Sequence, residues 1–171
     1  GRHYAGYDLD ESYIRLAEAR VAGERRRVAE EPAPVRPAGP LVEVARAVLA
    51  AAGLGDVRPA PRLPGGVQVA LAATDRLGRP WLFDLAGGLT SHRPGLRRSD
   101  ALWKAVATAA VVQQVQPAPL VLLTPALPAP GTTPAQVLAA VTGPGRAVRA
   151  VVDVLDPRAP ADLAEVVAGP A

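Results

Sequence analysis

Residues 67–85, VQVALAATDRLGRPWLFDL, decide the fold that the sequence predicts. Apolar and polar side chains alternate imperfectly over residues 67–73 and predict one β-strand, and residues 81–85 predict its partner. Between them, residues 75–78 have the composition of a tight turn. We therefore expect an antiparallel hairpin at the centre of this region.

Helices and further strands are predicted on both sides of the hairpin. Upstream, residues 41–52 place apolar side chains at helical spacing and end at a glycine. Downstream, Ser99 or Asp100 is the predicted cap of a helix over residues 101–114. The remaining segments predict a buried strand at 120–123, a helix at 135–141 capped by Thr132 or Thr133, an apolar strand at 147–155 and a short helix at 161–167. The predicted class is α/β, with the order α-β-β-α-β-α-β-α.

Composition divides the chain into three parts. Residues 24–40 pass from a charged helix end into a proline-rich stretch, which is typical of a semi-rigid linker. Residues 41–171 then form the α/β domain, and residues 1–23 form a separate βα unit.

The amino-terminal unit carries the most specific motif. Residues 1–20, GRHYAGYDLDESYIRLAEAR, predict a short strand, an acid at its carboxyl end and a helix. In open α/β sheets an acid at that position can accept both ribose hydroxyls of a nucleotide-like ligand, and Asp8 is that acid.

This string resembles the segment G-R-x-x-x-G-[IVY]-[DE]-x-[DN]-x-x-Y-x-x-[IL]-A-x-x-R, which closes many DNA methyltransferases acting on adenine N6 or cytosine N4. The resemblance implies S-adenosylmethionine as the cofactor of the parent protein, with Asp8 at its ribose and Tyr13 packing the helix onto the sheet. The glycine-rich cofactor loop and the D-P-P-Y or N-P-P-Y motif of such enzymes are absent from the sequence. We therefore expect a carboxyl-terminal fragment that needs the missing amino-terminal part of the methyltransferase domain as its partner and is inactive alone.

Composition limits the remaining possibilities. The chain has 171 residues, 49% of them apolar, which suffices for a core. It has no cysteine, which excludes disulfides and thiolate metal sites. No signal peptide and no membrane-length apolar run are evident, so we expect a soluble, cytoplasmic protein with no membrane partner.

The order helix, hairpin, helix, strand resembles the core of the restriction-endonuclease-like, or PD-(D/E)xK, superfamily. The resemblance implies a Mg²⁺ held by acids of the hairpin and a lysine that orients or activates water. Asp75 in the turn and Asp84 on the second strand are the candidate metal ligands and catalytic acids. Ala86 stands where the lysine is expected, so Lys104 on the following helix is the candidate replacement. Glu43 on the first helix would complete the acidic cluster.

A basic stretch suggests DNA as a partner. The net charge is +3, and the 19 Lys and Arg residues include a single lysine. Residues 92–104, HRPGLRRSDALWK, bring together the candidate phosphate ligands Arg93, Arg97, Arg98 and Lys104, with His92 beside them. We expect Trp103 in the same stretch to be a core anchor rather than a base-stacking platform.

Three functions remain open at this point. The first is a fragment of a DNA methyltransferase with an accessory domain that contacts DNA. The second makes that domain a metal-dependent nuclease, so that the parent joins restriction and modification. The third is a non-catalytic structural or partner-binding module.

Overall fold

The computed structural model describes residues 12, 14–19, 21–22, 40–89 and 95–169. The chain separates into two compact units, Gly1–Val35 and Arg36–Ala171. In the first unit the described residues are helical, as the motif predicts. Asp8, Tyr13 and the strand predicted before the helix lie outside the described residues, as does all of the predicted linker except Pro40.

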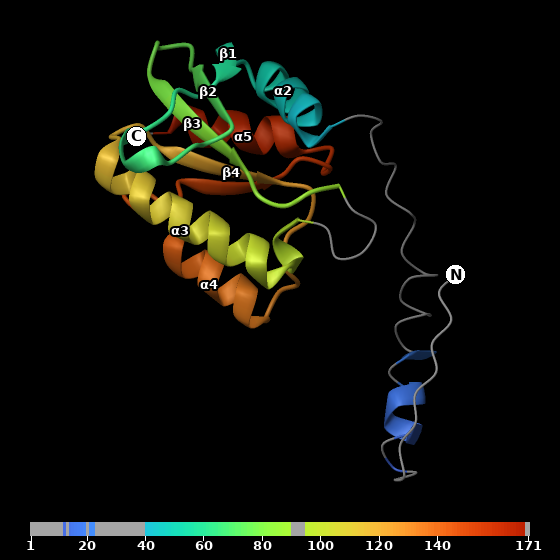
Figure 1. Cartoon of the computed structure of the whole chain (residues 1–171). Coiled ribbons are helices and arrows are strands. Elements are labelled where there is room, and N and C mark those ends of the chain that lie inside the picture. Colours follow the sequence, from blue (N-terminus) through green and yellow to red (C-terminus); the bar gives the residue numbers. More distant parts are fainter. Residues whose placement is uncertain (1–11, 13, 20, 23–39, 90–94, 170–171) are drawn as a thin grey trace. The chain divides into compact units, whose positions relative to one another are not determined.

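The second unit is built on a five-stranded mixed sheet whose strands lie in sequence order (Figure 1). The first three strands form an antiparallel meander, and the third, fourth and fifth run parallel to one another. The strands are β1 Gly55–Pro59, β2 Leu71–Thr74, β3 Pro80–Leu85, β4 Leu120–Thr124 and β5 Ala150–Asp153.

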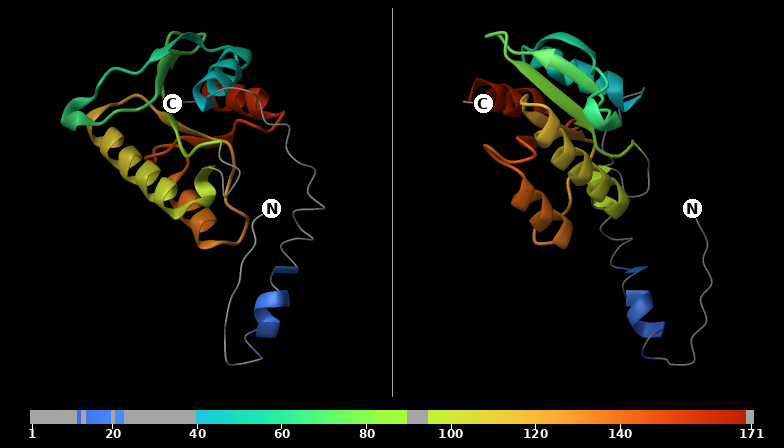
Figure 2. Two further views of the ribbon diagram at one scale, coloured as in Figure 1. Left: turned by 45° about the vertical axis from the view of Figure 1, so that its right-hand side comes forward. Right: turned by 60° about the vertical axis from the view of Figure 1, so that its left-hand side comes forward.

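Helices cover both faces of this sheet and give three layers, α/β/α (Figures 1 and 2). The helices of this unit are α2 Leu41–Ala51, α3 Ser99–Val115, α4 Thr133–Val141 and α5 Ala159–Ala168. The core on one face joins α2 and α5 to the sheet, and the core on the other face joins α3 and α4 to it. The predicted α/β class is confirmed at this level.

Strand β3 sits in the middle of the sheet and serves both cores. Trp81 and Phe83 are fully buried in the core under α2 and α5, whereas Leu82 is buried in the core under α3 and α4. Successive side chains of a strand point to opposite faces, so Asp84 falls on the same side as Leu82. The acid of β3 therefore belongs to the face that α3 covers.

Two strands differ from the sequence prediction. Strand β1 was missed, because its sequence Gly-Asp-Val-Arg-Pro has a single partly buried apolar residue, Val57, and no alternation. It adds a strand to the order, which becomes α-β-β-β-α-β-α-β-α. Strand β2 begins four residues later than predicted, since the segment after β1 carries Pro61, which has no N–H to donate, and then forms a 3-10 helix at Pro64–Gly66.

Helix α3 overturns two further predictions. Its N-cap residue is Arg98, and neither Ser99 nor Asp100 caps it; the Asp100 carboxylate instead accepts two N–H bonds from Arg98, at 3.0 and 2.8 Å. Trp103 is not a core anchor, because 57% of it is exposed. The buried stripe of α3 runs through Leu102, Ala105, Ala109 and Val112, and Trp103 lies outside it.

Candidate functional site

A cavity of about 390 Å³ lies between the carboxyl end of β3 and the first half of α3. Its walls come from three segments that are distant in sequence. The residues with functional groups are Gln68, Asp84, Arg98, Asp100, Lys104 and Thr108, and Gly87 and Gly88 close one side. Ligand sites of α/β proteins commonly lie at this end of the sheet.

Asp84 is the half-buried acid of this cavity. Burial raises the pKa of its carboxyl group, against the opposing effects of the Leu85 and Ala70 backbone N–H groups and of the Lys104 cation. The structure thus brings Asp84 together with Lys104, the pair that the nuclease hypothesis requires. A carboxyl group with a perturbed pKa in a cleft is typical of functional sites, although backbone amides also hold many strand-end acids without any such role.

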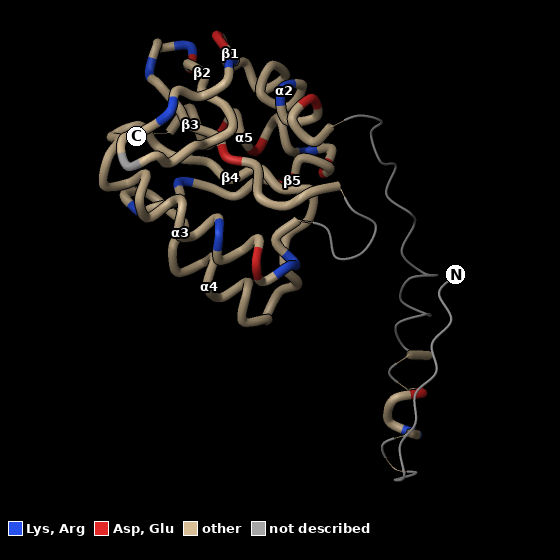
Figure 3. The backbone as a smooth tube through the Cα atoms, in the orientation of Figure 1, with Lys and Arg blue, Asp and Glu red and all other residues tan. Residues whose placement is uncertain are grey.

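Cations and acids balance around the cavity. Arg98 and Asp100 form an exposed ion pair at 2.8 Å, which raises the pKa of Arg98 and lowers that of Asp100 through the same hydrogen bonds. Lys104 and Asp84 supply one further charge of each sign. Figure 3 shows the same interleaving of basic and acidic positions over much of the unit. The two bonds to Asp100 engage two of the five N–H donors that a guanidinium carries.

The cavity wall at Gly87 is fixed by a close backbone approach. Gly87 and Gly95 have φ values of 87° and 61°. A Cβ on Gly87 would lie 2.5 Å from the Cα of Gly95, and a Cβ on Gly95 would lie 2.4 Å from Thr124 Oγ1. Buried Thr124 accepts the Leu96 N–H at 3.2 Å and donates to the Ala86 carbonyl at 3.0 Å. These contacts hold together the two ends of residues 87–95; His92 and Arg93 lie outside the described residues.

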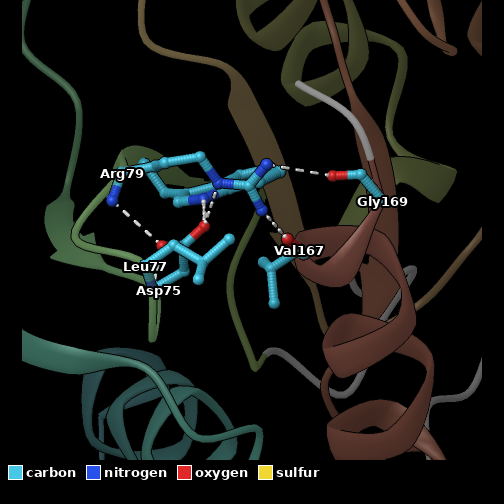
Figure 4. A network of polar contacts seen from close by, with 6 residues as sticks. Asp75, Leu77, Arg79, Val167 and Gly169 are labelled. Atoms are coloured by element: carbon cyan, nitrogen blue, oxygen red, sulfur yellow. Dashed lines mark hydrogen bonds and ion pairs between the residues drawn. The ribbon is translucent and has the colours of Figure 1, made fainter.

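Asp75 lies at the opposite end of β3, in the turn before the strand begins (Figure 4). Its Oδ1 accepts the backbone N–H groups of Leu77 and Arg79, both at 2.9 Å. Its Oδ2 accepts Arg79 Nε at 2.6 Å and Trp81 Nε1 at 3.1 Å. Burial raises the pKa of Asp75, but the hydrogen bonds from Arg79, Trp81 and Leu77 outweigh it, and the pKa falls to about 2. The structure therefore does not bring Asp75 to Asp84, and the turn carboxylate is engaged in holding the hairpin.

Arg79 extends this network to the last helix. Its guanidinium donates to the carbonyl oxygens of Val167 at 2.5 Å and Gly169 at 3.3 Å (Figure 4). Cations near a helix carboxyl terminus also interact favourably with the helix dipole. The network borders a second cavity of about 500 Å³ and ties the hairpin turn to α5.

The other predicted site residues lie away from the cavity. Glu43 is exposed in the first turn of α2, which covers the opposite face of the sheet. Arg97 is exposed, donates Nε to the Leu127 carbonyl at 3.1 Å, and its charge acts on Asp153. Of the predicted residues, the structure brings together Asp84, Lys104 and Arg98.

Sequence reasoning missed three residues that line the cavity, namely Gln68, Asp100 and Thr108. Gln68 was assigned to a strand, and Asp100 was assigned to a helix cap. Asp100, Lys104 and Thr108 follow one another at intervals of four residues, and this spacing on a helix places side chains on one face. That spacing was the signal that could have identified Asp100 and Thr108.

Among the residues that the structure describes, no three His, Cys, Asp or Glu residues are grouped so that they could hold a metal ion. No helix in the described part of the chain is both long and apolar enough to cross a bilayer.

The fold and site thus define a three-layer α/β domain with an acid and a lysine at the carboxyl end of a sheet strand. Comparison with protein-family models, curated proteins and solved structures found no match.

Proposed function

We propose that the α/β domain contacts the DNA backbone, as an accessory domain of a DNA methyltransferase. The observation that carries the DNA contact is that Lys104 and Arg98 line one cavity at the carboxyl edge of the sheet. Lysine and arginine are the usual ligands of DNA phosphates, and such contacts supply affinity with little sequence information. The methyltransferase assignment rests on the motif in residues 1–20.

Asp84 sets the conditions under which phosphate binds. An ionised carboxylate repels a phosphate, so Lys104 and Arg98 act on DNA against the charges of Asp84 and Asp100. Replacement of Asp84 by the neutral isostere asparagine removes this repulsion and should therefore strengthen DNA binding in the absence of divalent metal.

The test measures binding of a labelled duplex to the whole 171-residue chain over a series of salt concentrations. Lys104→Ala and Arg98→Ala should each weaken binding and lower the salt slope by about one unit per phosphate contact. Arg158→Ala is the matched control, since Arg158 also forms an exposed ion pair, with Asp162, at the start of α5. Equal effects of Arg98→Ala and Arg158→Ala on DNA affinity would mean that net charge alone accounts for the binding. Absence of DNA binding would leave a structural or partner-binding role.

A second function, metal-dependent cleavage of DNA, is favoured by the approach of Lys104 to Asp84. The carboxylate could serve as one Mg²⁺ ligand, the Gln68 amide is an oxygen donor in the same cavity, and Lys104 could orient water. No step of this chemistry needs Asp75 or Glu43, which lie elsewhere.

Asp84→Asn separates the two functions. If the domain only binds the DNA backbone, this variant binds DNA more tightly and Mg²⁺ has no specific effect on the binding. If the domain cleaves, Asp84→Asn and Lys104→Ala both abolish nicking of plasmid DNA in Mg²⁺ or Mn²⁺. Cleavage that survives in both variants would contradict a catalytic role for this cavity.

A further inference from the structure

The two tryptophans of the chain lie in opposite environments. Trp81 is 0% exposed and packs in the core under α2 and α5, whereas 57% of Trp103 is exposed on α3. A large aromatic side chain usually buries most of its area, and exposed aromatic side chains are common at binding surfaces. The exposed indole is therefore a candidate contact for a binding partner.

Trp103 lies beside the cavity. It follows Asp100 by three residues and precedes Lys104 by one, and both of these residues line the cavity wall. Residues three apart on a helix are surface neighbours, about 5–6 Å apart at Cβ. Lys104 follows Asp100 by four residues, so the indole and the Lys104 ammonium leave α3 on either side of Asp100, which pairs with Arg98.

We infer that Trp103 is a stacking platform for an unpaired nucleobase whose backbone phosphate is bound by Lys104 and Arg98. This inference rests on the proposed DNA contact and specifies the substrate class as single-stranded or unpaired DNA. Base–aromatic stacking combined with cationic groups that follow the backbone is the general mode of single-strand recognition. Duplex DNA keeps its bases stacked on one another, so a surface indole has no base face to contact there.

The surroundings of Trp103 on α3 are charged toward the start of the helix and apolar further along. Asp100, three residues before Trp103, is exposed and charged, whereas Val106 and Ala107, three and four residues after it, are apolar. Val111, which is 41% exposed, is the other large exposed apolar residue described on α3 and lies two turns further along. A second copy of the chain remains the alternative occupant that the experiment must separate.

Intrinsic fluorescence provides the test, because Trp103 is the exposed member of the two tryptophans. Addition of a short oligothymidylate to the whole chain should quench the emission, and a duplex of the same length should not. Trp103→Phe should abolish the quenching while keeping most of the affinity, since phenylalanine retains an aromatic face. Trp103→Ala should weaken oligothymidylate binding roughly 5- to 150-fold, the loss that follows from removal of one base–aromatic stack.

The outcomes distinguish this inference from the proposed function. Oligothymidylate binding that depends on Lys104 but is unchanged in Trp103→Ala would overturn the stacking role and leave the DNA contact intact. Failure of both oligonucleotides to bind would overturn both. A change in sedimentation mass in Trp103→Ala, without a change in DNA affinity, would assign the indole to contact between copies and overturn the inference. A thermal melt of each variant confirms that the exposed substitution leaves the fold intact.

Discussion

Gly95→Ala should be much more destabilising than other glycine substitutions of similar backbone conformation. Gly95 has φ +61°, and its added Cβ would lie 2.4 Å from Thr124 Oγ1 and 2.6 Å from the Ala126 carbonyl oxygen. Gly131 has φ +78°, and a Cβ there meets nothing within 4 Å. The two sites therefore share the left-handed conformation and differ in the contact.

The magnitudes follow from these two terms. An alanine in the left-handed region costs roughly 1–2 kcal/mol, which is the expected effect of Gly131→Ala. At Gly95 an overpacking cost of roughly 1–3 kcal/mol adds to it, because Thr124 and the Ala126 backbone are buried and cannot move away freely. We expect a total of roughly 2–5 kcal/mol for Gly95→Ala. The entropy that alanine removes from the unfolded chain is common to both variants and cancels in the comparison.

Urea unfolding of the whole chain, followed by tryptophan fluorescence and by circular dichroism, measures the difference. Gly95→Ala should unfold at a clearly lower urea concentration than Gly131→Ala at a similar slope. Gly66→Ala, with φ +77° and open space around the added Cβ, should behave like Gly131→Ala. Equal midpoints for Gly95→Ala and Gly131→Ala would refute the close packing that we describe at the cavity wall.

Three further predictions concern stability. Asp75→Asn should lower the melting temperature at neutral pH, and the difference from the native chain should shrink as the pH falls from 3.8 toward about 2, because the folded-state pKa of Asp75 is depressed to about 2. Asp84→Asn should have the opposite effect in the same melts. The folded-state pKa of the native Asp84 is raised, so its carboxyl group destabilises the fold as the pH rises above 3.8. The variant should therefore be more stable than the native chain at neutral pH and lose that gain in acid. Arg79→Ala should lower the free energy of unfolding in urea by about 1.5–3 kcal/mol, because the bonds to the carbonyl groups at the end of α5 are lost. Arg58→Ala breaks the exposed ion pair with Asp56 and should change the free energy of unfolding by less than about 1 kcal/mol.

Local sequence signals predicted most elements of the second unit. The turn at residues 75–78 forms as expected because Asp75 accepts nearby backbone N–H groups and Gly78 adopts φ +75°. Periodicity also placed α2 and β4 to within about one residue. Strand β1 was not predictable in this way, because it pairs along an edge with almost no apolar side chains of its own.

The candidate site was predictable only in part, because it depends on contacts between distant segments. The position of Lys104 on the helix after the hairpin suggested that it could approach Asp84, and the cavity contains both. The sequence placed Asp75 in the turn before the second hairpin strand and Asp84 on that strand, and the two acids were assigned to one cluster because the nuclease resemblance implies it. Trp103 was assigned to the core from its size, whereas small and branched residues fill the buried stripe of α3.

The contact of Arg79 with α5 has a consequence for synthesis of the chain on the ribosome. Arg79 donates to carbonyl groups 88 and 90 residues further along, and Leu163 of α5 is fully buried in the core that contains Trp81. Contacts between segments so distant must await translation of the second one. Helix α2 and the meander of β1, β2 and β3 thus emerge long before α5, and the part of the apolar face that α5 covers stays exposed until α5 has left the exit tunnel.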